Sequence, residues 1–467
     1  MQDLTPRRRF IARGAAGLAG ILASRQAPAL AQTIRLHLLH RVDFIPQGEA
    51  ELKRQLADYG RQMKMDVVLE TINENDLQTR ITSAIQSGAG PDIVQMLHNW
   101  PHLYAGGLVD VTDLCDWKQR DQGKFYPQSE AATREGSRWL GLPHCVTPAL
   151  INYRKSWFAE AGATAPPKNL DEYRKLGAVL KKKGKPFGQT LGHTVNDAPG
   201  WSYPLTWTFG GAETDKTGKK VVLNSKNTIE AVKWMTAFWK EACDEGGLAW
   251  DDTTNNRAFH AGEIAATLNG GSIYVLARRR TDIKDEKGQP LWPDIGHFRY
   301  PDGPHGPTPT YHVTYASTIM KHSKNVEAAK ELLKWVHSKE QFGKWFELEG
   351  GYATGANPVW EGHKMWTEVD EAMRPFKTAA QGARALGYAG PPSAKATLVY
   401  TKYIITDMYA KAVQGLAPED AVRWAEGELK KIYEVWSGGQ VLHYDIFGTR
   451  QPSITDVQCR NVRPDPE

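Results

Sequence analysis

The stretch QSGAGPDIV, residues 86–94, joins an expected helix to an expected buried strand. Before it, apolar residues recur at helical spacing from Leu77 to Ile85, and Asp76 can cap the start of that helix. Gly88 supplies the left-handed conformation that commonly ends a helix. The stretch then runs through Pro and Asp into an apolar segment, so it predicts one helix–strand unit of an α/β fold.

The residues before this stretch repeat the same alternation. An apolar run over 34–39 predicts a first strand, and the helix expected over 49–63 places its apolar residues on one face. A second strand is expected over 67–72. Strand and helix alternating in spans of about 20 residues is the pattern of a parallel sheet covered by helices, and we therefore predict an α/β fold.

The alternation continues less regularly through the rest of the chain. Asn169 and Glu172 form an expected capping box, and further amphipathic helices are expected from Asn224 and from Asn325. The proline-rich segment 301–309 predicts a loop or a crossover. A second lobe interleaved with the first along the chain would produce this pattern.

The N-terminal residues have the features of an export signal. Three arginines at 7–9 precede a weakly apolar segment rich in Gly and Ala, and small residues at 29–31 provide a cleavage site after Ala31. The paired arginines followed by Phe-Ile resemble a twin-arginine signal, which delivers folded cargo; an ordinary secretory signal is the alternative. In both cases we expect residues 1–31 to be removed and the mature chain to leave the cytoplasm.

Removing this segment changes the charge balance. It holds five arginines and one acid, so the formal net charge falls from +5 to +1. A nearly balanced chain gives no electrostatic reason to expect nucleic acid or an anionic membrane as a partner. The roughly 436 residues that remain exceed what one core usually contains and predict two lobes.

The four cysteines include no Cys-x-x-Cys pair, so a zinc or redox motif is not expected. One alternative is that Cys115 and Cys145 form a disulfide in an oxidising compartment. The other alternative, with equal support from the sequence, is that both cysteines are buried and unpaired.

Five segments, in order along the chain, resemble the family 1 extracellular solute-binding proteins, which are maltose-binding-protein-like sugar-binding proteins of ABC importers. The stretch 86–94 is similar to the helix-Gly-Pro-Asp-strand signature of that family, and WLGLP at 139–143 is similar to its strand entering the hinge. The resemblance extends over residues 35–436. The other three segments lie at 150–161, 259–266 and 323–329.

The resemblance implies two α/β lobes joined by hinge crossovers, with a ligand in the central cleft and closure by hinge motion. It also implies a monomeric periplasmic protein that delivers its ligand to the membrane permease subunits of an ABC importer, with no cofactor and no bond chemistry. The implied parts are lobe 1 at 32–146 and 312–360, lobe 2 at 147–311 and 361–436, and a C-terminal extension at 437–467.

Candidate ligand contacts lie in the loops that follow the strands, because open α/β sheets bind ligands at the carboxyl ends of their strands. The first strand is followed by His40 and Asp43, and the third by Asn99 and Trp100. The resemblance adds that a polar residue at the position of Asn99 often contacts ligand. Relatives often carry an acid where Thr147 stands, so the usual carboxylate contact is in doubt here.

The second lobe and the return crossover supply the other candidates. A loop before an expected helix carries Asn196 and Trp201. The crossover lacks the Gly-rich sequence common in the family, so a bulkier cleft is expected. The remaining candidates are Asn269, Gly270 and Gly271 at a strand end, Tyr311 and His312 on the crossover, and Tyr352 after two glycines.

These residue types indicate the ligand class. A sugar or polyol has an apolar C–H face that stacks on Trp or Tyr, and hydroxyls that bond to planar polar groups. Trp100 and Trp201 are the tryptophans we expect at the ligand, while most of the sixteen are expected in the cores. A glycerol phosphate or another small polar solute is the alternative, with Arg41 or Arg384 as the anion contact. A metal site at the histidines is not expected, because no helix carries a pair of ligands with a third in support.

Motifs of competing protein classes are absent from the sequence. No Gly-x-Gly-x-x-Gly follows the first strand, and no Cys-x-x-Cys-His or cysteine cluster indicates an oxidoreductase. The hydrolase motifs Gly-x-Ser-x-Gly and His-Glu-x-x-His are also missing. The paired carboxylates of a glycosidase stay open, because such pairs meet only in the fold. We therefore expect a binding protein rather than an enzyme, with an exported hydrolase as the remaining alternative.

Overall fold

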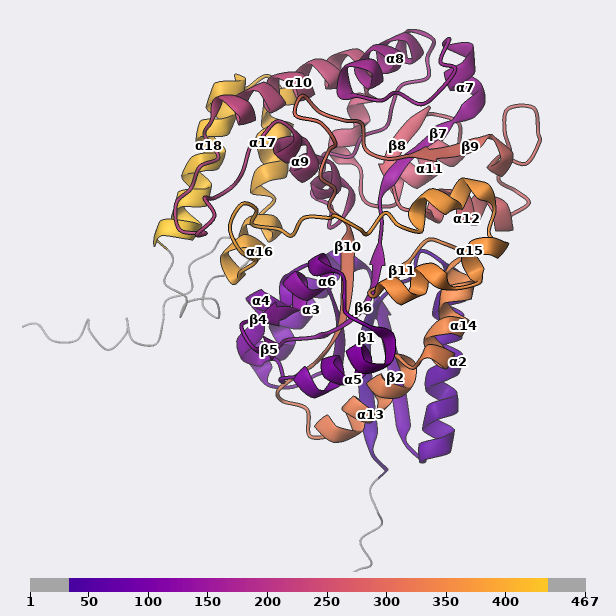
Figure 1. Cartoon of the computed structure of the whole chain (residues 1–467), viewed down its shortest axis with the longest axis vertical. Coiled ribbons are helices and arrows are strands. Elements are labelled where there is room, and N and C mark those ends of the chain that lie inside the picture. The colour runs from indigo at the N-terminus through magenta and orange to yellow at the C-terminus, as the bar shows by residue number, and fades with distance from the viewer. Residues whose placement is uncertain (1–32, 436–467) are drawn as a thin grey trace, which may run out of the picture.

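The computed structural model describes residues 33–435 (Figure 1). The expected export signal, the expected C-terminal extension and Cys459 lie outside these residues. Within them the helices and strands gather around two main sheets, one in each of two lobes. The prediction of a two-lobed α/β fold is confirmed.

Lobe 1, the lower lobe in Figure 1, is built on a six-stranded sheet with the order β11-β6-β10-β3-β1-β2. The three strands that come first in the chain, β1, β2 and β3, are mutually parallel, as the strand–helix alternation predicts. β10 runs antiparallel between β3 and β6. The strands are β1 (Arg35–Arg41), β2 (Asp66–Ile72), β3 (Ile93–Leu97), β6 (Leu142–Thr147), β10 (Val313–Ile319) and β11 (Thr354–Gly355).

Helices cover both faces of this sheet (Figure 1). A two-stranded hairpin, β4 (Arg134–Glu135) with β5 (Arg138–Trp139), lies beside them. The α-helices are α2 (Pro46–Met63), α3 (Glu74–Ser87), α4 (Trp100–Leu103), α5 (Thr112–Gln122), α6 (Pro127–Thr133), α13 (Val326–Val336) and α14 (Lys339–Glu349).

The stretch 86–94 forms the connection that its sequence predicts. Gly88 ends α3 with φ +62°, and its N–H donates to the carbonyls of the last turn. The start of α3 differs from the expectation, because Asn73 and not Asp76 is the cap: its side chain accepts from the Asn75 N–H at 2.9 Å. The helix therefore begins three residues earlier, and Glu74 occupies its first position.

Lobe 2, the upper lobe in Figure 1, contains an antiparallel three-stranded sheet with the order β8-β7-β9. The capping box at α8 is confirmed: Asn169 accepts from the Glu172 N–H at 2.9 Å. The strands are β7 (Leu150–Arg154), β8 (Ala266–Asn269) and β9 (Ile295–Phe298). The α-helices are α7 (Lys155–Glu160), α8 (Leu170–Lys182), α9 (Asp197–Thr208), α10 (Lys226–Ala242), α11 (Thr254–His260), α12 (Ser272–Arg279), α16 (Ala394–Thr401), α17 (Ile404–Val413) and α18 (Pro418–Lys430).

The lobes are connected by extended segments and are packed against each other. The chain passes from β6 through Pro148 and Ala149 into β7, and it returns into β10 (Figure 1). α15 (Met365–Glu368) lies between the lobes, and one apolar cluster contains Leu39 of lobe 1 together with Phe259 of lobe 2. The structure is therefore a closed arrangement of the lobes.

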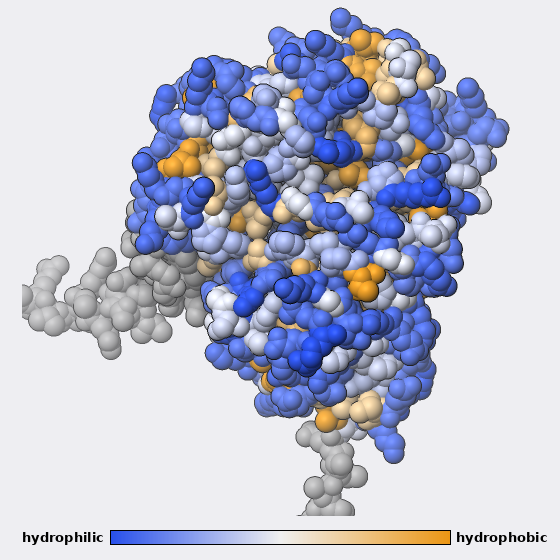
Figure 2. Space-filling view, in the orientation of Figure 1, coloured by the Kyte–Doolittle hydropathy of each residue, from blue (hydrophilic) through white to orange (hydrophobic). Residues whose placement is uncertain are grey.

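Two further observations concern the described residues. Cys115 and Cys145 are both buried and free, so the disulfide alternative is wrong. None of the helices in the described part is long and apolar enough to cross a membrane. Hydrophilic residues cover most of the face shown in Figure 2, and its apolar residues form small separate patches.

Candidate ligand-binding cleft

Two adjoining cavities lie where the lobes meet. The inner cavity has a volume of about 30 Å³, which is the space of about one water molecule in the liquid. The outer cavity has a volume of about 170 Å³. Phe44, in the loop after β1, and Asp252, in the loop before α11, line both. The two cavities therefore form one cleft, with the outer part at its mouth.

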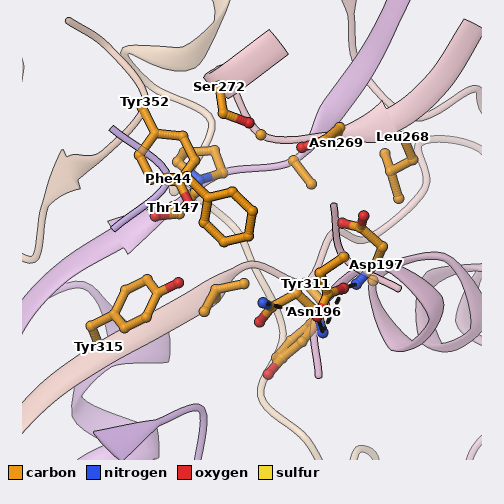
Figure 3. Close-up of a pocket in the computed structure, with 16 residues that line it drawn as sticks. Phe44, Thr147, Asn196, Asp197, Leu268, Asn269, Ser272, Tyr311, Tyr315 and Tyr352 are labelled. Atoms are coloured by element: carbon orange, nitrogen blue, oxygen red, sulfur yellow. Dashed lines mark hydrogen bonds between the residues drawn. The ribbon is translucent and has the colours of Figure 1, made fainter. Parts of the chain in front are cut away.

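Aromatic side chains line the inner cavity on the side of lobe 1. Figure 3 shows Phe44, Tyr315 and Tyr352 on that side, facing the lobe 2 segment that carries Asn196 and Asp197. Tyr315 comes from β10, whose alternating side chains place it on the cavity face together with Val313.

Two hydroxyls in the inner cavity have no hydrogen-bond partner among the described residues. They belong to Tyr315, which is 1% exposed, and Thr147, which is 5% exposed. Burying a hydroxyl without a partner is unfavourable. A ligand that carries hydroxyls would satisfy both groups, so these atoms indicate a polar ligand.

The lobe 2 wall of the cleft is held by a buried carboxylate. Asp252 accepts from the backbone N–H groups of Val195, Asn196 and Asp197, at 3.0, 3.2 and 2.8 Å, which fixes the loop that starts α9. Burial raises the pKa of Asp252 to about 6. Burial, with the nearby Asp252 carboxylate, also raises the pKa of Asp197, which accepts from Asn255 at 2.7 Å.

A hydrogen bond between the lobes closes the mouth. Asn196 Nδ2 donates to Glu74 Oε1 at 3.0 Å. Glu74 is 6% exposed, and its second oxygen has no partner among the described residues. Burial raises the pKa of Glu74 to about 7; Arg41 opposes this shift and Asp252 adds to it.

His98 ties the crossover and lobe 2 to the loop after β3. Its Nε2 lies 3.0 Å from the Val195 carbonyl and 3.0 Å from the Tyr400 hydroxyl, and its Nδ1 meets the Tyr311 hydroxyl. Burial lowers the pKa of His98 to about 3, so the imidazole is neutral at neutral pH. A proton on Nε2 and a bare Nδ1 that accepts from Tyr311 satisfy these contacts. His98 adopts φ +54°, a conformation that non-glycine residues rarely take.

Seven of the residues expected at the ligand come together in the cleft. They are supplied by both lobes and by both crossovers, as the strand-end argument predicts. Asp43 lies in the outer cavity and the other six in the inner one. These residues are Asp43, Thr147, Asn196, Asn269, Gly270, Tyr311 and Tyr352.

The structure places the two predicted ligand tryptophans, Trp100 and Trp201, outside the cleft. Trp201 is 0% exposed and packs in the lobe 2 core, stacked on Phe238, with its Nε1 donating to Met235 Sδ at 3.2 Å. Trp100 is buried in the apolar cluster around lobe 1, and it does not line either cavity. α9 is buried on nearly every side, and Trp201 packs in the apolar cluster of lobe 2 instead of the cleft.

Two of the other expected residues are also placed elsewhere. His40 lines a separate cavity of about 20 Å³ inside lobe 1. His312 supports the crossover: its Nε2 pairs with the Ala379 carbonyl at 2.7 Å, and its Nδ1 accepts from the Ala149 N–H. Both histidines belong to the scaffold of the cleft and not to its lining.

Asn99 and Gly271 pack beside the cleft without lining it. The Asn99 carbonyl accepts from Thr397 of α16 at 2.8 Å, and its side chain is buried. A Cβ on Gly271 would lie 2.6 Å from the methyl of Met373. The close backbone approach at this glycine is therefore made to protein and not to the cavity.

Several residues that line the cleft were not among the sequence candidates, and they include Phe44, Glu74, Asp252 and Tyr315. Phe44 directly follows Asp43, a sequence candidate in the loop after the first strand, so the strand-end argument could have included it. Glu74 was hidden by the choice of Asp76 as the helix cap. Nothing in the local pattern marks Asp252 or Tyr315.

The arginines considered as anion contacts do not line the cleft. Arg41 is buried behind the aromatic wall, 4.5 Å from the Tyr315 ring centroid, and pairs with Asp43 at 3.3 Å. Arg384 stacks on Tyr388 at 3.9 Å. Within residues 33–435, no three His, Cys, Asp or Glu side chains form a group that could hold a metal ion.

Comparisons with known sequences find relatives that are binding proteins. The family model for the bacterial extracellular solute-binding proteins matches residues 55–374. A binding protein of Brucella abortus is 24% identical, over 60% of this chain and 66% of its own length. The maltotriose-binding protein of Pyrococcus abyssi is 24% identical, over 65% of this chain and 63% of its own length. The chain thus spans just under two thirds of these curated relatives.

Solved structures share the two-lobed fold. Maltose-bound MalE3 of T. maritima superposes with a TM-score of 0.72 at 20% identity, covering 85% of this chain and 99% of that one. A Thermotoga lettingae solute-binding protein bound to α-D-tagatose gives 0.73 at 20% identity, covering 86% and 100%. An Agrobacterium radiobacter solute-binding protein in complex with ribitol gives 0.71 at 18% identity, covering 85% and 98%.

Proposed function

This chain belongs to the bacterial extracellular solute-binding proteins, and on that premise we propose that it captures a sugar or polyol between its lobes for an ABC importer. The membrane permease subunits of that importer would receive the ligand from the closed protein. The family consists of binding proteins and not enzymes, and our proposal contains no bond-breaking step. It includes export to the periplasm through the twin-arginine signal and action as a monomer.

One observation carries the choice of ligand class. The inner cavity presents two buried hydroxyls without partners, on Tyr315 and Thr147, beside aromatic rings and the amide of Asn269. Aromatic faces with a few convergent polar groups are what a sugar or polyol requires. The relatives support this choice, because the names of several refer to maltotriose, maltose, tagatose or ribitol.

The size of the cavities supports a mechanism of opening and closure. An inner cavity of about 30 Å³ is too small for a sugar ring. The lobes must therefore separate about the crossovers at 147–150 and 311–313 for a ligand to enter. Ligand contacts from both lobes then favour a closed form whose inner cavity is wider than in the arrangement of Figure 1, and the permease would recognise that form.

The alternative ligand, a glycerol phosphate, receives less support. No Lys, Arg or His is among the described side chains that line the two cavities. A phosphate would need such a cation or a group of backbone N–H donors. A neutral or positively charged ligand suits the cleft better.

A thermal-shift screen of the processed protein against monosaccharides, oligosaccharides, polyols, glycerol phosphates and amino acids tests the proposal. A ligand at about 100 times its Kd adds roughly 2.7 kcal/mol to the free energy of unfolding, which gives a clear shift in Tm. We expect a hit among the sugars or polyols. A hit only among amino acids or phosphates would contradict the proposal.

A further inference from the structure

The mouth of the cleft has an excess of negative charge. Four carboxylates line the outer cavity, and no basic side chain does so among the described residues. Asp43 and Asp251 are each paired with an arginine, at 3.3 and 3.8 Å. Glu74 and Asp252 form no ion pair with any Lys, Arg or His of residues 33–435. The outer cavity therefore contains two carboxylates that have no ion-pair partner among the described residues, although Arg41 acts on Glu74 from a distance and backbone N–H groups donate to Asp252.

Closure brings these two carboxylates together from opposite lobes. Asn196 Nδ2 lies 3.0 Å from Glu74 Oε1 and 3.4 Å from Asp252 Oδ2, so one amide group is shared between them. Asp197 adds a third, half-buried carboxylate on the lobe 2 side. Burying like charges without a counter-charge is costly. The closed form is therefore incomplete without a positive charge or bound protons at this place.

Independent polar atoms show where the rest of a ligand would lie. Glu74 Oε2 is buried and has no partner among the described residues. The hydroxyls of Tyr315 and Thr147, each more than nine-tenths buried, lack partners in the adjoining inner cavity, and Figure 3 shows Tyr315 directed into it. Glu74 lines the outer cavity and can accept from a charged donor, while the two hydroxyls belong to residues that line the inner cavity.

We propose that the ligand is a small polyhydroxylated compound that carries a protonated amine, such as an amino sugar or an amino polyol. Its ammonium group lies against Glu74 and Asp252, and its hydroxyls reach Tyr315 and Thr147. Charge-assisted N–H···O bonds are stronger than neutral ones, and an ammonium between the two lobes removes the repulsion that opposes closure. This inference rests on the proposed function and specifies its ligand.

The test compares compounds that differ only in the amine. Isothermal titration calorimetry of the processed wild-type protein measures four pairs: glucose and glucosamine, galactose and galactosamine, mannose and mannosamine, sorbitol and 1-amino-1-deoxysorbitol. In at least one pair we expect the amine to bind about 10-fold or more tightly, the advantage of a hydrogen bond to a charged group.

Charge-neutralising variants locate the effect. Glu74→Gln keeps the size of the side chain, and it should reduce the amine's advantage about 10-fold. Asp252→Asn removes the other carboxylate charge that faces the ammonium, and its Oδ1 can still accept from the Asp197 N–H, so it tests the same point if the first variant does not fold. Glu327→Gln on the exposed surface of α13 is the control, and should leave the advantage unchanged.

The outcomes separate this inference from the function on which it rests. Equal affinities within every pair, or tighter binding of the neutral members, would overturn the amine and leave sugar capture standing. No binding by any of the eight compounds would overturn the amine inference alone, because the proposed function is decided by the wider thermal-shift screen, which includes oligosaccharides. An amine advantage that persists in Glu74→Gln and in Asp252→Asn would overturn the placement of the ammonium at the mouth.

Discussion

Replacing Tyr315 by phenylalanine removes one buried hydroxyl and keeps the aromatic ring that Arg41 packs against at 4.5 Å. Tyr315 is 1% exposed, and its hydroxyl has no partner among the described residues. Its removal relieves a desolvation cost of about 1 kcal/mol. For a chain of this length, the corresponding rise in Tm is about 1–2 °C, because the shift per kcal/mol becomes smaller as chains become longer.

The same substitution weakens ligand binding, because a hydroxyl of the ligand loses its partner. A neutral hydrogen bond contributes about 0.5–1.5 kcal/mol, which corresponds to a roughly 2- to 12-fold rise in Kd. The variant should therefore be more stable and bind less tightly. Thermal unfolding without ligand, together with calorimetric titration of a hit from the screen, measures both quantities.

A matched control distinguishes this effect from the general cost of removing a tyrosine hydroxyl. The hydroxyl of Tyr104 lies 3.0 Å from Thr82 Oγ1, so Tyr104→Phe should lower Tm and leave the Kd unchanged. If Tyr315→Phe also lowers Tm with no change in Kd, the hydroxyl has a partner within the protein and does not face the ligand. The reasoning about the inner cavity would then be refuted.

Three other perturbations test particular parts of the structure. Trp201→Ala should lower the free energy of unfolding by about 3–5 kcal/mol, measured by denaturant unfolding, and leave the Kd of the folded protein unchanged, because this side chain fills the lobe 2 core. Glu213→Gln should raise Tm at pH 8 and not at pH 4: burial raises the pKa of Glu213 to about 8, so the wild type loses stability as pH rises from about 4.5 to 8. Arg279→Ala should increase the radius of gyration of the ligand-free protein in X-ray scattering, because Arg279 donates across the lobes to Gln47 at 3.1 Å and to the Leu348 carbonyl at 2.6 Å.

Each of these three predictions has a contradicting result. A large loss of affinity in Trp201→Ala with little loss of stability would show that this tryptophan contacts the ligand and does not only fill the core. A Glu213→Gln effect that is equal at both pH values would mean that folding does not raise the pKa of this carboxyl. Arg280→Ala is the control for the third, since Arg280 pairs with Asp282 in its own lobe, and equal scattering changes in both variants would exclude an interlobe cause.

The first half of lobe 1 is predictable from the sequence because its signals are local. The strands and helices up to β3 follow one another with regular apolar spacing, and Gly88 marks a helix end with its own backbone conformation. The start of α3 was misjudged because Asn73 and Asp76 are both good caps, and only the end of β2 decides between them. That difference of three residues hid Glu74.

The cleft is less predictable because it is assembled by contacts between distant segments. Glu74 and Asp252 lie on different lobes, far apart in the chain, and only closure brings them to the same amide of Asn196. Residues at strand ends, such as Asn269 and Thr147, were found because strand order alone places them there. Trp201 was misplaced because α9 is apolar on almost every side, so periodicity gives no direction for its side chains.

The central claim is that the cleft between the lobes binds one sugar or polyol molecule. Isothermal titration calorimetry of the processed protein with the strongest hit of the thermal-shift screen tests it most directly, when wild type is compared with Asn269→Ala, which truncates a side chain that lines the inner cavity. The account predicts one ligand per chain in the wild type, and an affinity at least several-fold weaker in the variant. No binding heat with any sugar or polyol, or a Kd that Asn269→Ala leaves unchanged, would contradict it.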